Sequence, residues 1–275
     1  MERVSSPVPE RYRRLGEFLR LKRERLLPDE VGLPSSGRRR TQGLRREEVA
    51  SIANVGVSWY TWLEQGRAAG ASIEVLDAVA AALRLDADEH RYVLGLARVD
   101  GGARVLEPSP ADYSRYAGLA ETITAPAYVI DPCWRVIATN NPARECFETE
   151  IGKSRLEKFF LESDFSTRFL NEDLIGRSLV EQFRAQSARY PEDLIFDRTA
   201  QRLRARSALF RKYWDLHVVG ESYREDITFR HAKLGLLTFE PLSLTFDDEA
   251  QLRLITYLPG RQARMSSAGS AREAK

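Results

Sequence analysis

The chain has 275 residues, of which 43% are hydrophobic and 30% charged, and its formal net charge is +2. This length suits one large domain or two of ordinary size, and the apolar fraction excludes a wholly disordered chain. Two cysteines exclude a disulfide framework and a four-cysteine zinc site. The polar N-terminus has no signal-peptide pattern, and no apolar run approaches the ~20 residues that span a bilayer. We therefore expect a soluble, cytoplasmic protein without a membrane partner.

Charge is unevenly distributed along the chain. Residues 1–67 carry 14 basic and 9 acidic side chains, whereas the remainder carries 28 basic and 31 acidic ones. The total charge does not indicate a nucleic-acid partner. The asymmetry nevertheless places any polyanionic partner at the N-terminal end.

Glycine and proline mark a boundary near residue 100. Gly101 and Gly102, followed by Pro108 and Pro110, interrupt regular structure. The sequence before this boundary is typical of helices, and the sequence after it mixes strands with helices. The predicted organisation is a flexible N-terminus at 1–9, a helical domain at 10–99, a linker at 100–112, a second domain at 113–258 and a flexible tail at 259–275.

Five short helices are predicted in the N-terminal domain. Leu15, Phe18 and Leu19 give the first helix a one-sided apolar stripe. Ser72 is a candidate cap for the fourth helix, and Asp86 begins a D-x-x-E capping pattern at the fifth. The second helix is predicted to begin near residue 46, and the third to span 57–64.

The stretch 46–66 carries the sharpest signal in the sequence. Ala50 is a small residue where two helices must cross closely, and Asn54 can adopt a positive φ in the turn between them. Gly56 tolerates the cap geometry of the next helix, and Gly66 suits the left-handed position after it. This spacing is typical of a helix–turn–helix, in which the second helix enters the major groove of DNA.

The second domain reads as strands, then helices, then strands. Residues 127–130 and 134–138 are predicted strands joined across Asp131-Pro132. Asn140 is the predicted cap of a following helix. This order describes an α+β domain with helices packed on a sheet. Further helices are predicted at 174–189 and 193–213, and further strands at 217–219, 227–230, 234–240 and 252–258.

The N-terminal motif resembles the phage-repressor-like (XRE) helix–turn–helix family. Its members commonly read A-x-x-A-G-V-S before the recognition helix and close that helix with E-x-G. The chain departs from that pattern within the turn and keeps it at Ala50, Ala53, Val55, Glu64 and Gly66.

Nearly the whole chain is similar to the MmyB-like regulators. Residues 29–34, 37–41 and 43–50 carry the N-terminal part of this resemblance, and Asn140 with the clusters in 209–218 and 231–240 carries the C-terminal part. The resemblance implies a multidomain protein: an all-α five-helix DNA-binding bundle, then an α+β PAS-like domain. That domain is an antiparallel sheet with flanking helices that enclose a small-molecule cavity. A lipophilic, fatty-acid-like effector is therefore expected.

DNA contacts are predicted from the arginine cluster beside the motif and from the outer face of the third helix. The arginines suit phosphate contacts, which supply affinity without reading sequence. Val57, Ser58 and Trp62 are expected to face base edges. The alternatives are a solvated arginine-rich loop and burial of Trp59 and Trp62 against it. The predicted DNA-binding residues are Arg38, Arg39, Arg40, Arg45, Arg46, Val57, Ser58, Trp59, Thr61, Trp62 and Arg67.

An apolar cavity with few polar groups is the functional interpretation of the second domain. The alternative is that its aromatic residues form the core and that its histidines are satisfied core residues. The predicted ligand-binding residues are Tyr128, Trp134, Phe183, Phe210, Trp214, His217, His231, Leu236 and Phe239.

The sequence contains no complete catalytic motif. Gly152-Lys153-Ser154 matches the end of the phosphate-binding loop pattern G-x-x-x-x-G-K-S, but Phe147 occupies the position where that pattern requires its first glycine. Cys133 and Cys146 lack metal-ligand spacing to the histidines. We therefore predict no enzyme activity, no cofactor and no metal.

The sequence favours a sequence-specific transcription regulator that senses a small effector. It is expected to bind operator DNA as a homodimer, because one small bundle reads only a half-site. One alternative is that the second domain only dimerises or docks a protein partner, without a ligand. Another is that this domain is an enzyme regulated by the first.

Overall fold

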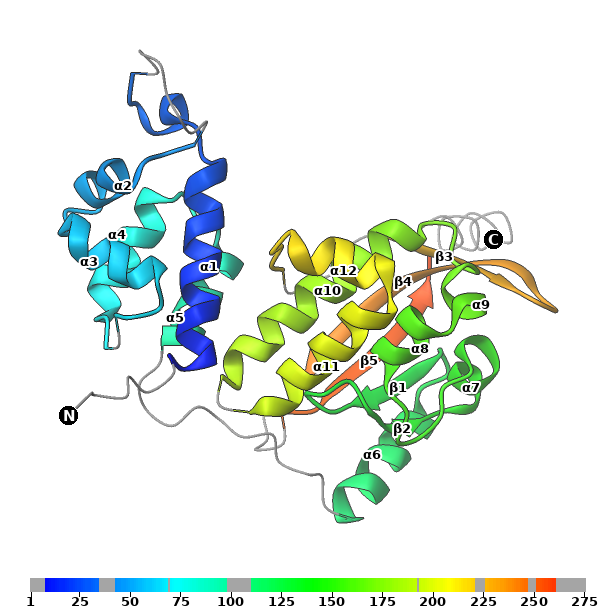
Figure 1. Ribbon diagram of the computed structural model, residues 1–275. Helices are drawn as coiled ribbons and strands as arrows, with labels where there is room; N and C mark the ends of the chain where they lie inside the picture. The colour runs from blue at the N-terminus through cyan, green and yellow to red at the C-terminus, as the bar shows by residue number, and fades with distance from the viewer. Residues whose placement is uncertain are drawn as a thin grey trace, which may run out of the picture. The chain divides into compact units, whose positions relative to one another are not determined.

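The computed structural model describes residues 8–34, 43–68, 70–97, 110–191, 193–220, 226–246 and 251–260. The chain divides into two compact units, one of residues 1–104 with 184–194 and the other of 105–183 with 195–275. The N-terminal part is helical, and a sheet lies in the second unit (Figure 1).

The described residues of the N-terminal unit form a helical bundle, as predicted. Its long first helix packs against the third and fifth α-helices. Leu15, Phe18 and Leu19 of the first helix are buried, as its apolar stripe predicts. The elements are α1 (Glu10–Arg25), the 3₁₀ helix η1 (Pro28–Val31), α2 (Arg46–Ile52), α3 (Val57–Glu64), α4 (Ile73–Ala82) and α5 (Ala87–Ala97).

Side-chain caps fix where two of these helices begin. The Ser72 hydroxyl accepts a hydrogen bond from the backbone N–H of Val75 at 3.4 Å. At the start of α5, Glu89 N–H donates to the Asp86 carboxylate at 2.9 Å, and Asp86 N–H donates back to the Glu89 carboxylate at 3.2 Å. The reciprocal pair satisfies two otherwise unpaired donors, which confirms the predicted capping box.

The second unit contains an antiparallel sheet with flanking helices, as predicted. Within the described residues the strand order is β2-β1-β5-β4-β3, and every neighbouring pair is antiparallel. The strands are β1 (Ala127–Ile130), β2 (Val136–Thr139), β3 (Ile227–His231), β4 (Gly235–Thr245) and β5 (Arg253–Pro259). The helices are α6 (Pro110–Thr122), α7 (Asn141–Phe147), α8 (Arg155–Leu161), α9 (Ser163–Ser166), α10 (Glu172–Arg189), α11 (Leu194–Arg206) and α12 (Ala208–Asp215). The last part of α10, from residue 184, belongs to the first unit.

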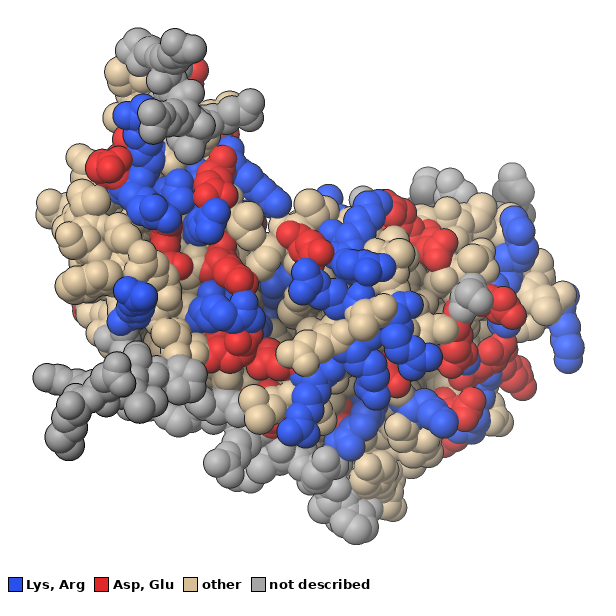
Figure 2. Space-filling view, viewed as in Figure 1, with Lys and Arg blue, Asp and Glu red and all other residues tan. Residues whose placement is uncertain are grey.

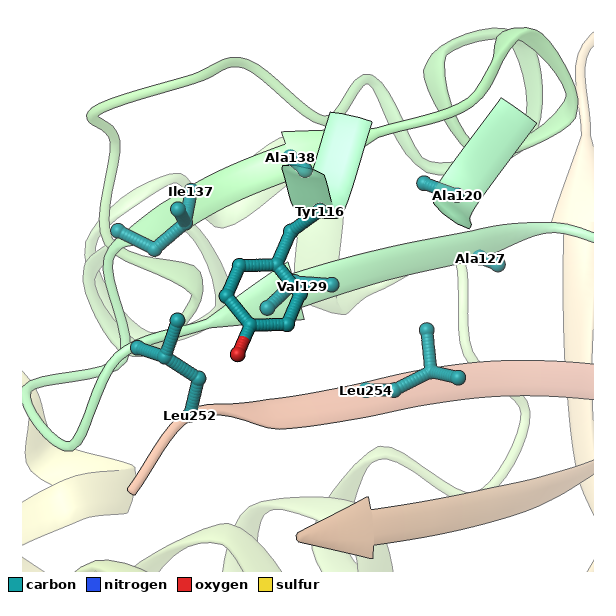
Figure 3. Close-up of a cluster of buried hydrophobic side chains, with 8 residues drawn as sticks. All are labelled: Tyr116, Ala120, Ala127, Val129, Ile137, Ala138, Leu252 and Leu254. Atoms are coloured by element: carbon teal, nitrogen blue, oxygen red, sulfur yellow. The ribbon is translucent and has the colours of Figure 1, made fainter. Parts of the chain in front are cut away.

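Alternation along the central strands separates two faces of the sheet. Val129 of β1 and Leu254 of β5 are paired and pack with Tyr116 of α6 in a buried cluster (Figure 3). Successive strand residues point to opposite faces. The next pair, Tyr128 and Ile255, therefore faces away from α6. That opposite face is where the cavity described below is found.

Asn140 joins three segments of the second unit and is 1% exposed. Its Oδ1 accepts hydrogen bonds from the backbone N–H groups of Ala143, at the start of α7, and Ala127, at the start of β1, both at 3.0 Å. Its Nδ2 donates to the carbonyls of Ile123 and Ala125, both at 2.8 Å. The side chain thus satisfies four backbone groups, one of which is the predicted cap of α7.

We expect Asn140→Leu to destabilise the second unit by about 3 kcal/mol. Leucine has a similar volume but leaves buried donors and acceptors unpaired, each of which costs about 1–3 kcal/mol. Urea unfolding followed by far-UV circular dichroism measures this loss. The matched variant Asn141→Leu alters the exposed neighbour and should change the free energy of unfolding by less than about 1 kcal/mol. Equal losses in the two variants would contradict the bridging role.

Three predicted elements differ from the structure. Residues 217–219 do not form a strand, because the chain turns at His217, whose φ is +50°. The predicted helix 193–213 is two helices, because Ser207 interrupts the first and caps α12 by accepting from Phe210 N–H at 3.1 Å. The strand predicted at 134–138 begins at Val136, since Trp134 occupies the turn with a φ of +67°.

Candidate functional site

The turn between α2 and α3 has the geometry that its residues predict. Ala50 is fully buried and its carbonyl accepts from Val55 N–H at 2.9 Å. Asn54 adopts a φ of +53°, in the left-handed region. Gly56 occupies the N-cap position of α3 in an extended conformation. The turn therefore holds α3 in a fixed orientation relative to α2.

Close backbone contacts secure α3 from the inner side. Gly66, with a φ of +70°, follows α3, and a Cβ there would lie 2.9 Å from the Tyr12 backbone. A Cβ on Gly16 of α1 would lie 2.3 Å from the Glu64 carbonyl oxygen. Glycine is thus required where α1 crosses the end of α3. The sequence indicated Gly66 but gave no signal for Gly16, because only the tertiary crossing reveals it.

The outer face of α3 is open. Tyr60 and Leu63 are buried, whereas Val57 is 42% and Trp62 53% exposed. Ser58 is also exposed. These three outward residues are the ones predicted to face base edges, and they share one side of the helix.

The remaining predicted DNA contacts in the described residues differ in their exposure. Trp59 and Thr61 are partly buried, and the Thr61 hydroxyl donates to the Val57 carbonyl at 2.8 Å. Arg67, just beyond α3, is exposed. Arg45 is exposed before α2, and its backbone N–H donates to Glu48 at 2.7 Å. Arg38, Arg39 and Arg40 lie outside the described residues.

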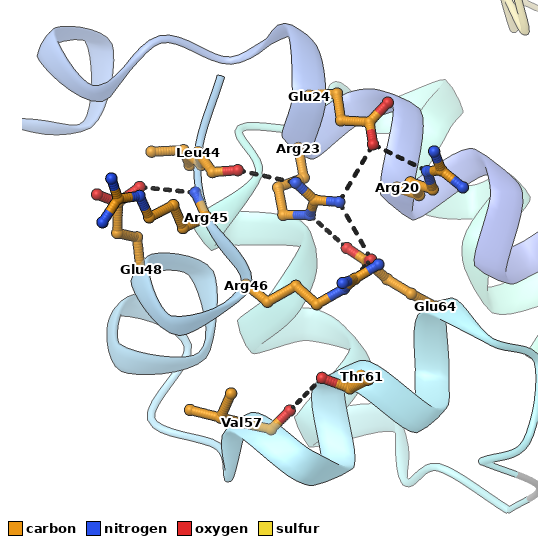
Figure 4. A network of polar contacts seen from close by, with 10 residues as sticks. All are labelled: Arg20, Arg23, Glu24, Leu44, Arg45, Arg46, Glu48, Val57, Thr61 and Glu64. Atoms are coloured by element: carbon orange, nitrogen blue, oxygen red, sulfur yellow. Dashed lines mark hydrogen bonds and ion pairs between the residues drawn. The ribbon is translucent and has the colours of Figure 1, made fainter. Parts of the chain in front are cut away.

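A buried carboxylate joins α1, α2 and α3 (Figure 4). The Glu64 side chain is 1% exposed and pairs with the Arg23 guanidinium, Oε1 to Nε, at 2.5 Å. Its other oxygen lies 2.7 Å from Nε of Arg46. Arg23 also donates to the Leu44 carbonyl at 2.9 Å. Arg46 was predicted as a phosphate contact, but one edge of its guanidinium is occupied by Glu64.

This network keeps its charges in place despite burial. Burial alone would lower the pKa of Arg23, but the hydrogen bond and the charge of Glu64 outweigh it and raise that pKa above its ordinary value. Burial and the same carboxylate raise the pKa of Tyr60. At ordinary pH Arg23 is therefore charged and Tyr60 is neutral. The buried contacts between these groups and Glu64 hold the C-terminal end of α3 in place.

A cavity of about 110 Å³ lies in the second unit, on the face of the sheet opposite α6. Strand residues of β1, β4 and β5 form one wall, and α8, α9 and α10 contribute the other. For scale, a dry cavity of about 150 Å³ holds a benzene-sized molecule. The lining residues are Tyr128, Trp134, Arg155, Phe159, Phe165, Phe169, Ile175, Ser178, Leu179, Gln182, Ile227, Pro241, Leu242, Ser243, Ile255 and Tyr257.

Arg155 is the cationic group in this cavity lining. It is 9% exposed, and its guanidinium carbon lies 5.1 Å from the Tyr128 ring centroid and 5.2 Å from that of Phe165. It donates to the Phe147 carbonyl at 3.2 Å. Among the described residues it has no carboxylate within ion-pair distance. A buried charge ordinarily has an ionic partner, so the cavity offers one side of an ion pair.

Trp134 supplies a second unsatisfied group. Its side chain lines the cavity, is 4% exposed, and its indole N–H has no hydrogen-bond partner in the described part of the chain. Its backbone φ of +67° is strained for a bulky residue. Buried donors are rarely left unpaired, so this N–H is available to an acceptor on a ligand.

The structure brings two of the nine predicted ligand residues, Tyr128 and Trp134, to the cavity. Phe183, Phe210 and Trp214 pack on one another, with Phe210 and Trp214 stacked at 5.4 Å. These three lie away from the lining because they fill the contact between α10 and α12, which is the core alternative stated above.

The other four predicted residues also lie outside the lining. His217 occupies the turn after α12, and His231 holds the β3–β4 hairpin by accepting from the backbone of Lys233 and Leu234. Leu236 is exposed, and Phe239 packs on Phe147. Hairpin and turn geometry, which the apolar pattern did not reveal, directs these side chains elsewhere.

Sequence reasoning missed most of the lining, above all Arg155. The phenylalanines of residues 159–169 were the available signal, since four aromatic residues within eleven positions are unusual for an exposed segment. Helices α8 and α9 were not predicted from the sequence, so their residues were assigned neither to an element nor to the cavity.

Two known protein families match the chain, one in its N-terminal part and one in its C-terminal part. A family described as "Helix-turn-helix domain" matches residues 14–93, and one described as "MmyB-like transcription regulator ligand binding domain" matches residues 117–267. No curated protein gives a match. Both families are regulatory rather than enzymatic. Among the described helices, none is long and apolar enough to cross a membrane.

The fold and the two sites define a DNA-binding regulator that carries a ligand-binding domain. The ligand-binding family covers more than half of the 275 residues. The chain belongs to the MmyB-like transcription regulators.

Proposed function

We propose that this regulator acts in the cytoplasm as a homodimer that recognises a specific operator in double-stranded DNA through α3. The observation that carries this proposal is the outward row of Val57, Ser58 and Trp62 on a helix whose inner side is fixed by buried contacts. An α-helix held in this way fits the major groove, where base edges differ. Arg45, Arg46 and Arg67, with the cluster 38–40, supply phosphate contacts.

Trp62→Ala is expected to change the preferred DNA sequence at one or two positions while leaving the free energy of unfolding within about 0.5 kcal/mol of wild type. The indole is exposed, so its loss removes contacts to DNA rather than to the core. Each lost base contact is worth about 1–3 kcal/mol of discrimination. Selection from a randomised duplex pool measures the preference.

The matched control is Ile73→Ala, which removes an apolar side chain that is also exposed, on α4. Its selected sequences should equal those of wild type. If Trp62→Ala and Ile73→Ala select the same sequences as wild type, Trp62 does not read bases. If Trp62→Ala unfolds the bundle, its assignment to the surface is wrong.

For the second unit we infer a small lipophilic effector with an anionic, carboxylate-like head. The apolar lining suits its hydrocarbon part, while Arg155 and the indole N–H of Trp134 suit the head. A fatty-acid-like molecule has this chemistry. The cavity of about 110 Å³ accepts a short hydrocarbon group as it stands, and a longer chain requires α8–α10 to move outward.

Native mass spectrometry of the gently purified protein tests this inference. A stoichiometric small acid that is lost on denaturation is the expected result. An exchangeable ligand would escape detection, so the purified chain is also mixed with decanoic acid before measurement. Absence of both a resident and an added ligand would contradict the effector site.

A second role for this domain, dimerisation, is favoured by exposed leucines on β4. Leu236 is 60% and Leu244 50% exposed, and they lie on the same side of the strand because their positions differ by an even number. Apolar residues that line up on an exposed strand mark interaction surfaces. We propose that this side of β4 contacts a second copy of the chain.

The double variant Leu236→Lys/Leu244→Lys is expected to shift the protein from dimer to monomer. Charges buried in a paired interface lack partners and repel one another, while on a monomer they are solvated. Analytical ultracentrifugation gives the mass in solution. A dimer that persists in this variant, or a wild-type protein that is already monomeric, would contradict the proposal.

A further inference from the structure

Helix α11 presents a row of arginines on its outer side. Arg198, Arg202 and Arg206 recur every four residues and are all exposed. One such step rises about 6 Å along a helix, so the three guanidinium groups follow one line. The inner side of the same helix is formed by the buried residues Phe196, Ala200 and Leu203.

The basic surface continues on α12, where Arg211 and Lys212 are exposed. Figure 2 shows lysine and arginine side chains gathered over α11 and α12, which are yellow in Figure 1. We call the exposed cations of these two helices the α11–α12 basic face: Arg198, Arg202, Arg204, Arg206, Arg211 and Lys212.

Only part of this face is neutralised within the unit. Arg202 pairs with Glu157, Arg204 with Asp215 at 2.9 Å, and Lys212 with Asp173 at 2.8 Å. In the part of the chain that the structure describes, no carboxylate lies within ion-pair distance of the remaining three. The cations without such a partner are Arg198, Arg206 and Arg211.

Helix stability does not account for the whole row. Like charges four residues apart repel and destabilise a helix, and of the three arginines only Arg206 lies in the last turn, where a cation is favourable. The basic face lies in the part of the chain that has a net negative charge, residues 68–275, so its cations are concentrated locally against the overall charge of that part. Such a concentration of cations favours an anionic partner outside the unit.

We propose that the α11–α12 basic face binds the phosphate backbone of double-stranded DNA, in addition to the contacts of α3. Duplex DNA is the polyanion that this regulator already binds through its N-terminal unit. Because the chain links the two units, DNA held by one is at high effective concentration for the other. Phosphate contacts require charge and reach rather than base reading, which is what a row of arginines offers. The proposal thus extends the DNA footprint to the effector-binding unit.

The test is the salt dependence of DNA affinity in the full-length chain. The triple variant Arg198→Gln/Arg206→Gln/Arg211→Gln removes the three cations without breaking a described ion pair. Binding to a fluorescent mixed-sequence duplex is followed by anisotropy across a series of KCl concentrations. Each phosphate contact contributes about 0.9 to the slope of log K against log [salt], so we expect the slope to become shallower by about 2 to 3.

A matched control separates a local contact from total charge. Lys153→Gln/Arg230→Gln/Lys233→Gln removes three exposed cations of the same unit that lie on other elements. Its slope should equal that of wild type. Equal reductions in both triple variants, or no reduction in the first, would overturn the proposal. Thermal unfolding of both variants confirms that each is folded.

Two further outcomes separate this proposal from the proposed function. If the wild-type chain binds no duplex at any salt concentration, the proposed function fails together with this inference. If wild type binds DNA and the first triple variant keeps the full slope but loses binding to phosphatidylserine vesicles, the basic face contacts lipid, and only this inference is overturned.

Discussion

Glu64→Ala is expected to destabilise the helical unit by about 3–5 kcal/mol. The substitution leaves the guanidinium of Arg23 buried, 5% exposed, without the carboxylate that pairs with it. It also releases Arg46 at the start of α2. In a unit of this size about 1 kcal/mol lowers the Tm by 4–8 °C, so the Tm of this unit should fall by more than about 12 °C. Differential scanning calorimetry resolves the transition.

Glu17→Ala is the control for this result. Glu17 pairs with Arg13 at 2.7 Å on the surface of α1, and an exposed pair of this kind contributes less than about 1 kcal/mol. The double variant Arg23→Met/Glu64→Leu should be more stable than Glu64→Ala, because it leaves no unpaired buried charge. If Glu64→Ala is as stable as Glu17→Ala, the buried network does not hold α3 in place.

Arg155→Met is expected to weaken binding of a carboxylic acid to the cavity by about 10- to 150-fold. Methionine keeps an apolar stem but removes the charged donor, and a hydrogen bond to a charged group is worth about 1.5–3 kcal/mol. Isothermal titration calorimetry with hexanoic and decanoic acid measures the loss. The two chain lengths also test whether the cavity must open.

The methyl ester of decanoic acid provides the matched ligand for this prediction. It has no carboxylate, so wild type and Arg155→Met should bind it equally. If the variant loses affinity for acid and ester alike, Arg155 supports the shape of the cavity rather than a charged head. If it loses neither, the buried guanidinium does not contact the ligand.

The helical unit could be predicted closely because its signals are local. Ser72, Asp86 and Asn54 each act on backbone groups within a few residues, and the structure confirms all three. Glu64 was noted only as part of the closing pattern of α3. Its partner Arg23 is 41 residues earlier, and no spacing rule connects the two.

The cavity could not be predicted to the same degree. Apolar residues of the second unit divide between two faces of a sheet, and this division depends on which strands are neighbours. Tyr128 lines the cavity, whereas Phe210 and Trp214, predicted alongside it, pack in the core between helices. The PAS-like character, the dimer and the fatty-acid-like effector stay predictions.

Selection of binding sites from a randomised duplex pool by the full-length wild-type chain tests the central claim most directly. We expect one enriched motif, arranged as an inverted repeat whose half-sites lie about 10 base pairs apart or a multiple of that distance, because a two-fold dimer places two copies of α3 on the duplex. A pool that shows no sequence enrichment, although the protein is folded and binds DNA, would contradict recognition through α3.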